Sequence, residues 1–398
     1  MSPVVVSISV YGGTALVLFL LGWHVWHRER RVVRAGGGEL SFFSWEILTS
    51  VAILATVAGM RWMTGYDHEK YYNQYLSVLD TGEFMRFHFE PLFRWVTYSF
   101  AAVNAHFTLY FGFWALLQFG LLYYGLRHDK HLLPWVALVL MLGPWFLFYM
   151  NTIRQYVIES LFIVLVPLIA RRRFWLYVAC VVPAVLLHRF AWLLLFLYGF
   201  AFLPVRKSGN RWWALGALAA AILSGLKPYW LTVFKPLSTW FSSLGLGWWY
   251  EQNFAEIVNG GFRWVAFGPS RVAGLVVIVL LVLLYPQVKR HFKHDKVLPY
   301  FYAIMLVGEC LHNLFINTSF YFLRPIELLT ICTLVMTAYT LSYLYQKRRY
   351  WLLPLMLVFS CSNATIDLVK SVVAPTPSNI VSQYHFFFEG YKLPFDLP

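Results

Sequence analysis

Charged residues are scarce in this 398-residue sequence. Asp, Glu, Lys and Arg together make up 13% of it, about half the share of a typical soluble domain. Hydrophobic residues make up 60%, more than a single water-exposed domain can bury. These proportions exclude an ordinary soluble enzyme and an intrinsically disordered chain. They indicate an all-α, polytopic membrane protein, because backbone in lipid must satisfy its own hydrogen bonds.

Cysteine and the common soluble motifs are also nearly absent. The four cysteines, Cys180, Cys310, Cys332 and Cys361, lie in apolar stretches without a C-x-x-C pair, so we interpret them as packing residues. The chain lacks a Walker A loop, a dinucleotide fingerprint, a G-x-S-x-G elbow and an H-E-x-x-H pair. We therefore expect neither a cofactor nor a metal.

Apolar runs fill most of the chain and predict about twelve transmembrane helices in a single integral membrane domain over residues 1–398. The first run has no basic flank before it, which favours a spanning helix over a cleaved signal peptide. Two runs, 174–187 and 190–204, are short, so we expect tilt or a broken helix there. The others are 4–21, 45–63, 107–126, 132–150, 155–170, 212–226, 271–287, 297–316, 319–345 and 350–363.

The basic residues predict the orientation. Nineteen of the 32 Lys and Arg residues lie in alternate short connections, which the positive-inside rule places in the cytoplasm. These connections are 27–40, 127–131, 171–173, 206–211, 288–296 and 346–349. The same rule explains the net charge of +14 without nucleic acid as a partner. Both termini are then outside, with the segments 64–106, 227–270 and 364–398, at the periplasmic face of a bacterial inner membrane.

Two parts of these outer segments are expected to lie at the membrane surface. Residues 90–104 are apolar but too short to cross, so we predict a re-entrant or interfacial helix. Residues 228–250 combine several Trp and Phe residues with little charge, a composition typical of the membrane–water boundary.

Charge remaining near the outer ends of the predicted helices is costly unless it faces a cavity or a partner. Asp67 follows the Gly65 turn, and Tyr71 lies one helical turn later on the same face. Glu90 precedes Pro91, which marks a helix start. Each carboxylate is either a helix cap or salt-bridge partner, or a catalytic group.

Four further residues lie at the outer ends of predicted spans. Arg154 and Gln155 open one span and offer donors to an anion at a helix start, although the arginine could simply reach the interface. His188 and Arg189 interrupt an apolar run at the same level. The histidine is either a satisfied core residue or a group that accepts a proton or orients a hydroxyl.

Three more charged residues belong to the later half of the chain. Arg324 and Glu327 lie three residues apart on one helical face, as either an ion pair or part of a site. Arg263 follows the Gly260–Gly261 pair, which would allow a ligand to approach the backbone closely.

The order of these residues resembles the EpsG family of exopolysaccharide polymerases, which are Wzy-like. The resemblance extends over about residues 45–345. It is carried by a single ordered set: Arg61, Gly65, Asp67, Tyr71, Glu90–Pro91, Arg154–Gln155, His188 and Arg324.

The resemblance implies a multi-pass inner-membrane glycosyltransferase. It would join undecaprenyl-diphosphate-linked oligosaccharides, as donor and acceptor, into exopolysaccharide, capsule or O-antigen at the periplasmic face. A flippase and a chain-length regulator are the expected partner proteins, together with membrane lipid. Lipid diphosphate is the leaving group, and clustered arginines suit its negative charge.

Roles follow from this chemistry. We predict that Asp67 is the catalytic base, with Glu90 and His188 as rival candidates. We predict that Arg154, with Arg324 and Arg263, holds the diphosphate. Substrate contacts are also expected from a further set: Arg61, Tyr71, Gln155, Arg189 and Glu327.

Three other functions compete. Another polyisoprenyl-dependent glycosyltransferase or a ligase would use the same leaving group with a different acceptor. A polysaccharide or lipid transporter would show repeated halves and helices broken near the midplane, and neither pattern is present in the sequence. A membrane O-acyltransferase could also use a histidine.

Overall fold

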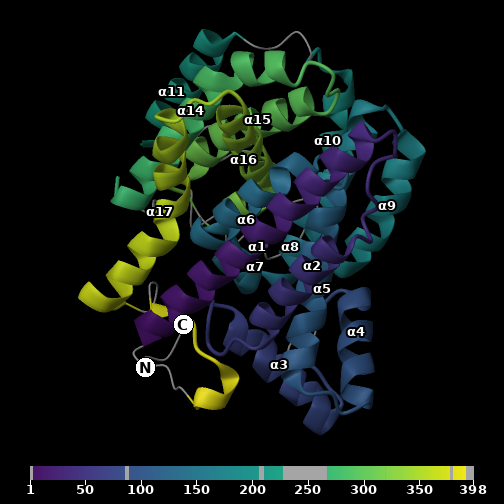
Figure 1. Cartoon of the computed structure of the whole chain (residues 1–398). Helices are drawn as coiled ribbons and strands as arrows, with labels where there is room; N and C mark the ends of the chain where they lie inside the picture. Colours follow the sequence, from purple (N-terminus) through teal and green to yellow (C-terminus); the bar gives the residue numbers. More distant parts are fainter. Residues whose placement is uncertain are drawn as a thin grey trace, which may run out of the picture. The chain divides into compact units, whose positions relative to one another are not determined.

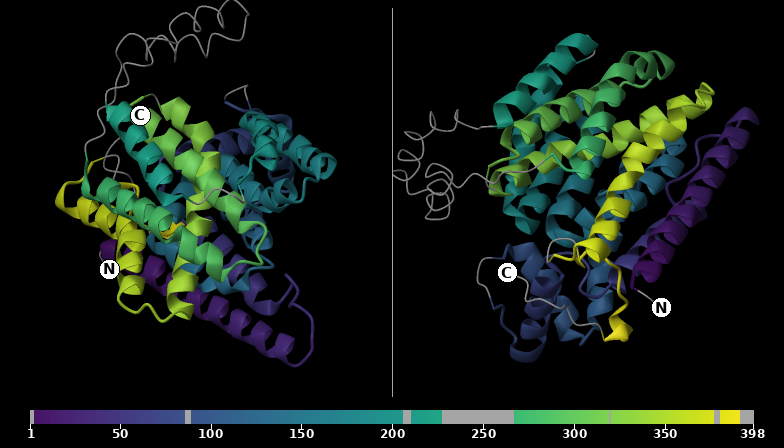
Figure 2. Two further views of the ribbon diagram at one scale, coloured as in Figure 1. Left: turned by 90° about the horizontal axis from the view of Figure 1, so that it is seen from above. Right: turned by 90° about the vertical axis from the view of Figure 1, so that its left-hand side faces the viewer.

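The computed structural model describes residues 3–85, 89–205, 210–226, 267–318, 320–376 and 380–390. The chain, drawn in Figures 1 and 2, divides into two compact units. Unit 1 comprises Met1–Phe202 and Thr337–Pro398, and unit 2 comprises Leu203–Met336. Within the described ranges every regular element is a helix, apart from one isolated β-bridge between Arg61 and Phe386. The all-α class is confirmed, whereas a single membrane domain over the whole chain stays a prediction.

Helices make up nearly all of the described part of unit 1. They are α1 (Pro3–Arg34), α2 (Trp45–Gly59), α3 (His68–Thr81), α4 (Pro91–Ala102), α5 (Phe107–Gly125), η1 (Lys130–Leu132), α6 (Leu133–Leu142), α7 (Trp145–Asn151), α8 (Ile153–Ala170), α9 (Phe174–Leu187), η2 (Arg189–Trp192), α10 (Leu193–Leu197), η3 (Tyr198–Phe202), α17 (Leu352–Val373) and η5 (Phe387–Glu389). Unit 1 also contains the end of α16 (Phe320–Gln346), from Thr337 onward.

Small residues let these helices approach one another closely. A side chain on Gly59 of α2 would meet the Thr108 carbonyl of α5 at 2.7 Å, and one on Gly22 of α1 would meet the Pro134 nitrogen of α6 at the same distance. Since lipid offers no hydrophobic drive for helix association, such close contact is a main source of cohesion between membrane helices. The bundle that carries the site is therefore packed backbone against backbone.

The predicted count of about twelve spanning helices is wrong for the part of the chain that the structure describes. Six helices there are long and apolar enough to cross a membrane, and a seventh is counted if Lys130–Leu142 and Trp145–Asn151, bent by 67°, form one span. Four other apolar runs gave helices of 10–17 residues, such as Trp45–Gly59 and Arg211–Leu226. The structure thus supports a multi-pass helical membrane protein with fewer full crossings.

Several helix ends differ from the predicted ones. α1 continues to Arg34 and α17 to Val373, well beyond the apolar runs that predicted them. The two short runs at 174–187 and 190–204 form α9 and the successive short helices η2, α10 and η3, and whether they tilt in a membrane stays a prediction. α4 forms where a short helix was predicted at 90–104, although its position in a membrane stays a prediction. Residues 228–250 lie outside the described residues.

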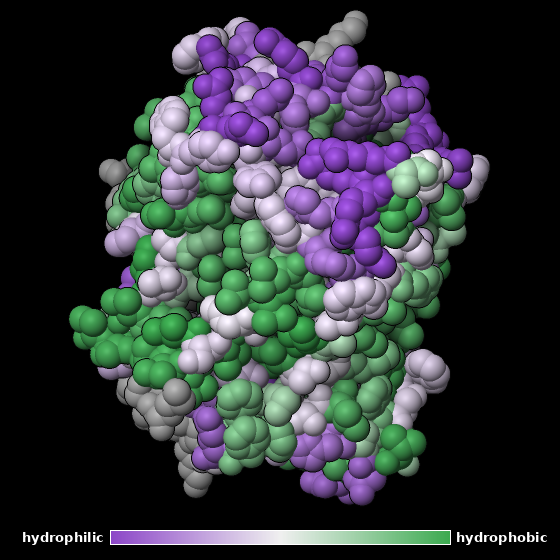
Figure 3. All heavy atoms as spheres, viewed as in Figure 1, coloured by the Kyte–Doolittle hydropathy of each residue, from purple (hydrophilic) through white to green (hydrophobic). Residues whose placement is uncertain are grey.

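Two of the predicted cytoplasmic loops of unit 1 lie together at one end. Lys130 Nζ lies 2.6 Å from the Glu29 carboxylate, and His128 Nδ1 lies 2.9 Å from that of Glu39. These two contacts join the connections 27–40 and 127–131. In Figure 3 hydrophilic residues cover this end of α1, whereas hydrophobic residues surround its middle.

The opposite end of unit 1, which we call the tail end, collects segments that the sequence predicted to be outside. The Trp62 N–H donates to the His385 carbonyl at 2.8 Å, and the Tyr384 N–H donates to Ser7 Oγ at 2.7 Å. α3 and α4 lie at this end as well (Figures 1 and 2). Within unit 1 the structure therefore brings parts of these segments together, while the side of the membrane on which each segment lies stays a prediction.

Unit 2 packs α11 (Arg211–Leu226), α14 (Pro269–His291), α15 (Leu298–Phe315) and the first part of α16. The Asn317 amide donates to the Gly225 carbonyl of α11 at 2.8 Å. Between α15 and α16, the Thr333 hydroxyl donates to the Glu309 carboxylate at 2.5 Å. Polar side chains thus bridge helices on both sides of α15.

Candidate functional site

Unit 1 contains eight of the residues predicted to belong to the site. Five of them form a group, and the structure connects four of these around Glu90. One carboxylate oxygen of Glu90 bonds to Arg154 Nη1, and the other accepts the Arg189 N–H at 3.0 Å. The Tyr71 hydroxyl bonds to the Arg154 guanidinium. The fifth, His188, is adjacent to Arg189 in the chain. We call Tyr71, Glu90, Arg154, His188 and Arg189 the Glu90 cluster.

Helix ends place each member of this cluster. Pro91 opens α4 and forces Glu90 into an extended conformation. Arg154 is the second residue of α8, just after the Thr152 break that ends α7. His188 is extended between α9 and η2. The sequence therefore builds the site from interruptions in its helices.

Aromatic rings enclose the Arg154 guanidinium. Its central carbon lies 4.8 Å from the centre of the Phe89 ring and 4.9 Å from that of Phe93. The side chains of Arg154 and Glu90 are only 16% and 12% exposed. Electrostatic attraction is stronger in such surroundings than in water, and cation–π contacts add to it. The pair is thus held in place more firmly than a surface ion pair.

Asp67 lies beside the cluster at the start of α3. Its backbone N–H donates to Asn151 Oδ1 at 2.9 Å. Asn151 lies three residues before Arg154 in the chain. Its carboxylate makes no helix-cap hydrogen bond and lies 3.6 Å from Lys70 Nζ. Gly65 forms the predicted turn before it, with a φ of 89° that favours glycine. The Asp67 carboxylate is therefore less engaged than that of Glu90, both of whose oxygens are bonded.

His188 is buried and its tautomer can be inferred. Nδ1 accepts the Phe190 N–H at 3.2 Å, so a neutral ring carries its proton on Nε2. In that state Nε2 donates a hydrogen bond and does not accept a proton. The geometry therefore suits His188 to orienting an oxygen atom rather than to acting as the base.

Arg61 has a different setting from the one predicted. Its side chain is buried, donates from Nη2 to the Met150 carbonyl at 2.9 Å, and also donates to the Ala58 carbonyl. These carbonyls lie in the last turns of α7 and α2, where the helix dipole is negative. The geometry favours a structural role, and substrate binding by Arg61 stays an untested prediction.

Gln155 also turns toward the protein interior. Its amide donates to Glu159 Oε1 at 2.9 Å, and both side chains are buried. Glu159 is thus joined to Gln155, while Arg154 pairs with Glu90. Substrate contact by Gln155 stays a prediction that these bonds do not favour.

The site residues predicted in the later half of the chain are not part of unit 1, which contains this cluster. Arg324 and Glu327 lie on α16 in unit 2, half-buried, whereas Arg154 belongs to unit 1. Arg263 lies outside the described residues. Diphosphate binding by Arg154 together with Arg324 and Arg263 therefore stays a prediction.

Three neighbours of the site were not predicted from the sequence. Asn151 receives the Asp67 N–H, and Phe89 and Phe93 face Arg154. The aromatic residues on both sides of Glu90–Pro91 were a visible signal for the last two. In the described ranges no three His, Cys, Asp or Glu side chains gather in a way that suits a metal, and the expected absence of a metal stays a prediction.

Comparison with known protein families identifies a family for this chain. The model of the EpsG family, a Wzy-like polymerase family, matches residues 45–384. No curated protein and no solved structure matches the chain. The matched range includes α2 to α17, the Glu90 cluster and Asp67. Since it covers most of the chain, this protein belongs to the EpsG family.

Proposed function

We propose that this protein polymerises oligosaccharide repeat units carried on undecaprenyl diphosphate into an exopolysaccharide, capsule or O-antigen chain. Membership of the EpsG family suggests the polymerase role. The observation that carries the proposal is the Glu90 cluster, in which two arginines meet a carboxylate beside the weakly engaged Asp67. This combination offers both an anion site and a proton acceptor, the two needs of glycosyl transfer from a diphosphate.

In this proposal Arg154 and Arg189 bind the diphosphate of the donor. Within the described part of the chain the buried Arg154 Nε has no hydrogen-bond partner, so a donor remains for an incoming phosphate oxygen. Arg189 is 62% exposed and can turn toward the same anion. The guanidinium is suited to this task because it offers planar, paired donors. Glu90 holds Arg154 in position from the opposite side.

Asp67 accepts the proton of the acceptor hydroxyl in this proposal. The hydroxyl oxygen forms the new glycosidic bond while the bond from the sugar carbon to the diphosphate oxygen breaks. The electron pair leaves with the lipid diphosphate, whose charge the arginines stabilise. His188 donates from Nε2 to a sugar or phosphate oxygen. The tail end faces the periplasm, where the lipid-linked donor is presented.

The test is chain elongation by purified protein supplied with lipid-linked repeat units, with polymer length resolved on a gel and donor binding measured separately. Asp67→Asn keeps the shape of the side chain but removes its basicity, so we expect normal donor binding and a rate lower by about 10²-fold or more. Asp80→Asn is the matched control, since Asp80 is an exposed residue of the same helix. It should polymerise normally.

The arginine site is tested with the same assay. Arg154→Lys should weaken donor binding, because an ammonium group cannot reproduce the paired donors of a guanidinium. Arg94→Lys, on the exposed face of α4, is the control. Normal polymerisation by both Asp67→Asn and Arg154→Lys would refute the assigned roles. Transfer of one unit to a non-repeat acceptor, with no elongation, would favour a ligase.

A further inference from the structure

A basic cavity lies in unit 2, where the turn after α14 leads into α15. Its volume is about 560 Å³. Four of its lining residues are Lys or Arg: Lys289, Arg290, Lys293 and Lys296. His294 also lines it, and Asp295 is its one acidic residue. None of these residues belongs to the Glu90 cluster or has a part in the proposed polymerisation.

Asp295, the one acidic residue of the lining, also caps a helix. The Asp295 carboxylate accepts the N–H groups of Val297 and Leu298, at 2.7 and 3.1 Å, and so caps the start of α15. The lining therefore contains four cationic side chains and a single carboxylate, which accepts backbone N–H groups. Like charges gathered on one turn repel one another unless solvent or an anion screens them.

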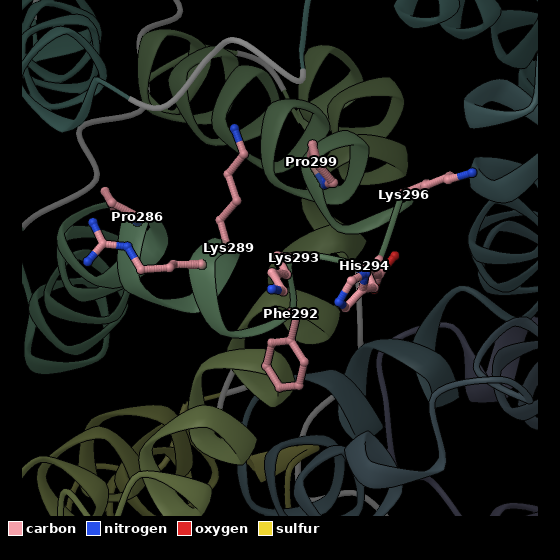
Figure 4. A pocket seen from close by; sticks show the side chains of 9 residues that line it. Pro286, Lys289, Phe292, Lys293, His294, Lys296 and Pro299 are labelled. Carbon is pink, nitrogen blue, oxygen red and sulfur yellow. The ribbon is translucent and has the colours of Figure 1, made fainter.

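Two simpler explanations account for only part of this arrangement. Basic residues in the last turn of α14, such as Lys289 and Arg290, also complement the helix dipole. Lys293 and Lys296 lie beyond that turn. The positive-inside rule explains basic residues in the connection 288–296, but it does not require them to surround a cavity. Figure 4 shows Lys289, Lys293 and His294 around the turn, with the Lys296 side chain extending away from Lys289.

The position of the cavity indicates the chemistry of its ligand. α14 is an apolar helix of 23 residues that qualifies as a membrane span, so its basic end lies near the membrane–water boundary. Half-buried Lys289 has its Nζ 5.8 Å from the centre of the Tyr285 ring, one turn nearer the apolar part of α14. Pro286, Phe292 and Pro299 add apolar lining. A phosphate group joined to acyl chains matches this combination of cations and apolar walls.

We propose that this cavity binds the phosphate headgroup of an anionic membrane phospholipid. The phosphate lies among Lys289, Arg290 and Lys293, and the acyl chains follow the apolar surface of α14. This is a second anion site, formed by other residues than the one proposed for the polymerisation donor.

The experiment measures lipid retention by the full-length protein in detergent, using native mass spectrometry. The probes are dioctanoyl phosphatidylglycerol, dioctanoyl phosphatidylcholine and inorganic phosphate. We expect the protein to retain phosphatidylglycerol in preference to phosphatidylcholine. The double variant Lys289→Gln/Lys293→Gln should bind phosphatidylglycerol about 20- to 30-fold more weakly, from the loss of two charges near the membrane surface.

A matched control removes the same charge elsewhere. Lys347→Gln/Arg349→Gln alters another basic turn, with both residues exposed, and should retain the lipid like the unmodified protein. Lys293→Gln alone changes an exposed residue of the turn and should weaken retention about 5-fold without affecting folding. Equal loss in the control would show a general charge effect and overturn the proposal. Binding of inorganic phosphate as strong as that of the lipid would assign the cavity to a soluble anion instead.

Discussion

The pair formed by Glu90 and Arg154 should contribute more to stability than an ion pair on the surface. Removing one partner of a fully buried ion pair costs about 3–5 kcal/mol, whereas an exposed pair is worth about 0–1 kcal/mol. The two side chains are 12% and 16% exposed, so they are close to the buried case. Arg154 also keeps its contacts with Tyr71 and the two Phe rings when Glu90 is changed. We therefore expect Glu90→Gln to lower the free energy of unfolding by about 2–3 kcal/mol.

A double-mutant cycle isolates the interaction between the two groups. Arg154→Met leaves an apolar side chain between Phe89 and Phe93 and removes the charge. The double variant Glu90→Gln/Arg154→Met should be more stable than the sum of the single effects predicts, with a coupling energy of about 1.5–3 kcal/mol. Unfolding by SDS in mixed micelles, followed by Trp fluorescence, provides the free energies.

The control is an ion pair in the same region that is exposed. Lys70 Nζ lies 3.6 Å from Asp67, and the Lys70 side chain is 54% exposed. Lys70→Met should change the stability by about 0.5 kcal/mol or less. If the coupling energy of Glu90 and Arg154 were equally small, the reasoning from their burial would be refuted.

Three further results are expected. Gly59→Ala should destabilise the contact of α2 with α5 by about 1–3 kcal/mol, because its new methyl group would meet the Thr108 carbonyl at 2.7 Å. Gly120→Ala is the control: its methyl group enters open space, so it should be neutral or stabilising in the same unfolding assay. Burial and the charge of Arg61 hold the pKa of His68 well below its ordinary value of 6.5, so the folded state keeps it neutral and stability falls as the pH drops below about 6.5. Between pH 7 and pH 5.5 the unmodified protein should lose about 1 kcal/mol of stability because of His68, and His68→Phe should abolish this loss. An unchanged pH dependence in the variant would contradict the prediction. An alkaline phosphatase fusion after Asn104 should be active and one after Arg173 inactive, and the reverse pattern would overturn the orientation.

Hydrophobicity along the sequence was enough to predict the central helices of unit 1. The runs 107–126 and 155–170 correspond to α5 and α8 within two residues at either end. It was not enough to predict where a helix stops. α1 continues past its apolar run because its polar last turns are stabilised by contacts far along the chain, such as that between Glu29 and Lys130. Such partners are not visible in local composition.

The sequence predicted which residues of the candidate site lie at the same level, but not which side chains bond to one another. Alternate connections of a membrane protein share one side, so Glu90, Arg154 and His188 could be placed at the same level. The sequence did not indicate that Arg154 pairs with Glu90, 64 residues away, while Glu159 bonds to Gln155 in its own helix. The sequence also did not distinguish Arg61, which donates to carbonyls at two helix ends, from the arginines of the Glu90 cluster. These choices depend on tertiary packing.

The cluster and the helix breaks depend on each other. Backbone that leaves a helix within a membrane protein must find other hydrogen-bond partners. Glu90 supplies one of them, since it accepts the N–H of Arg189 at the start of η2 as well as the Arg154 side chain. Asn151 does the same for the N–H of Asp67 at the start of α3. The side chains that stabilise the interrupted backbone are therefore the ones that fix the arginine, so the interruption of α9 and the position of Arg154 are maintained by a single carboxylate.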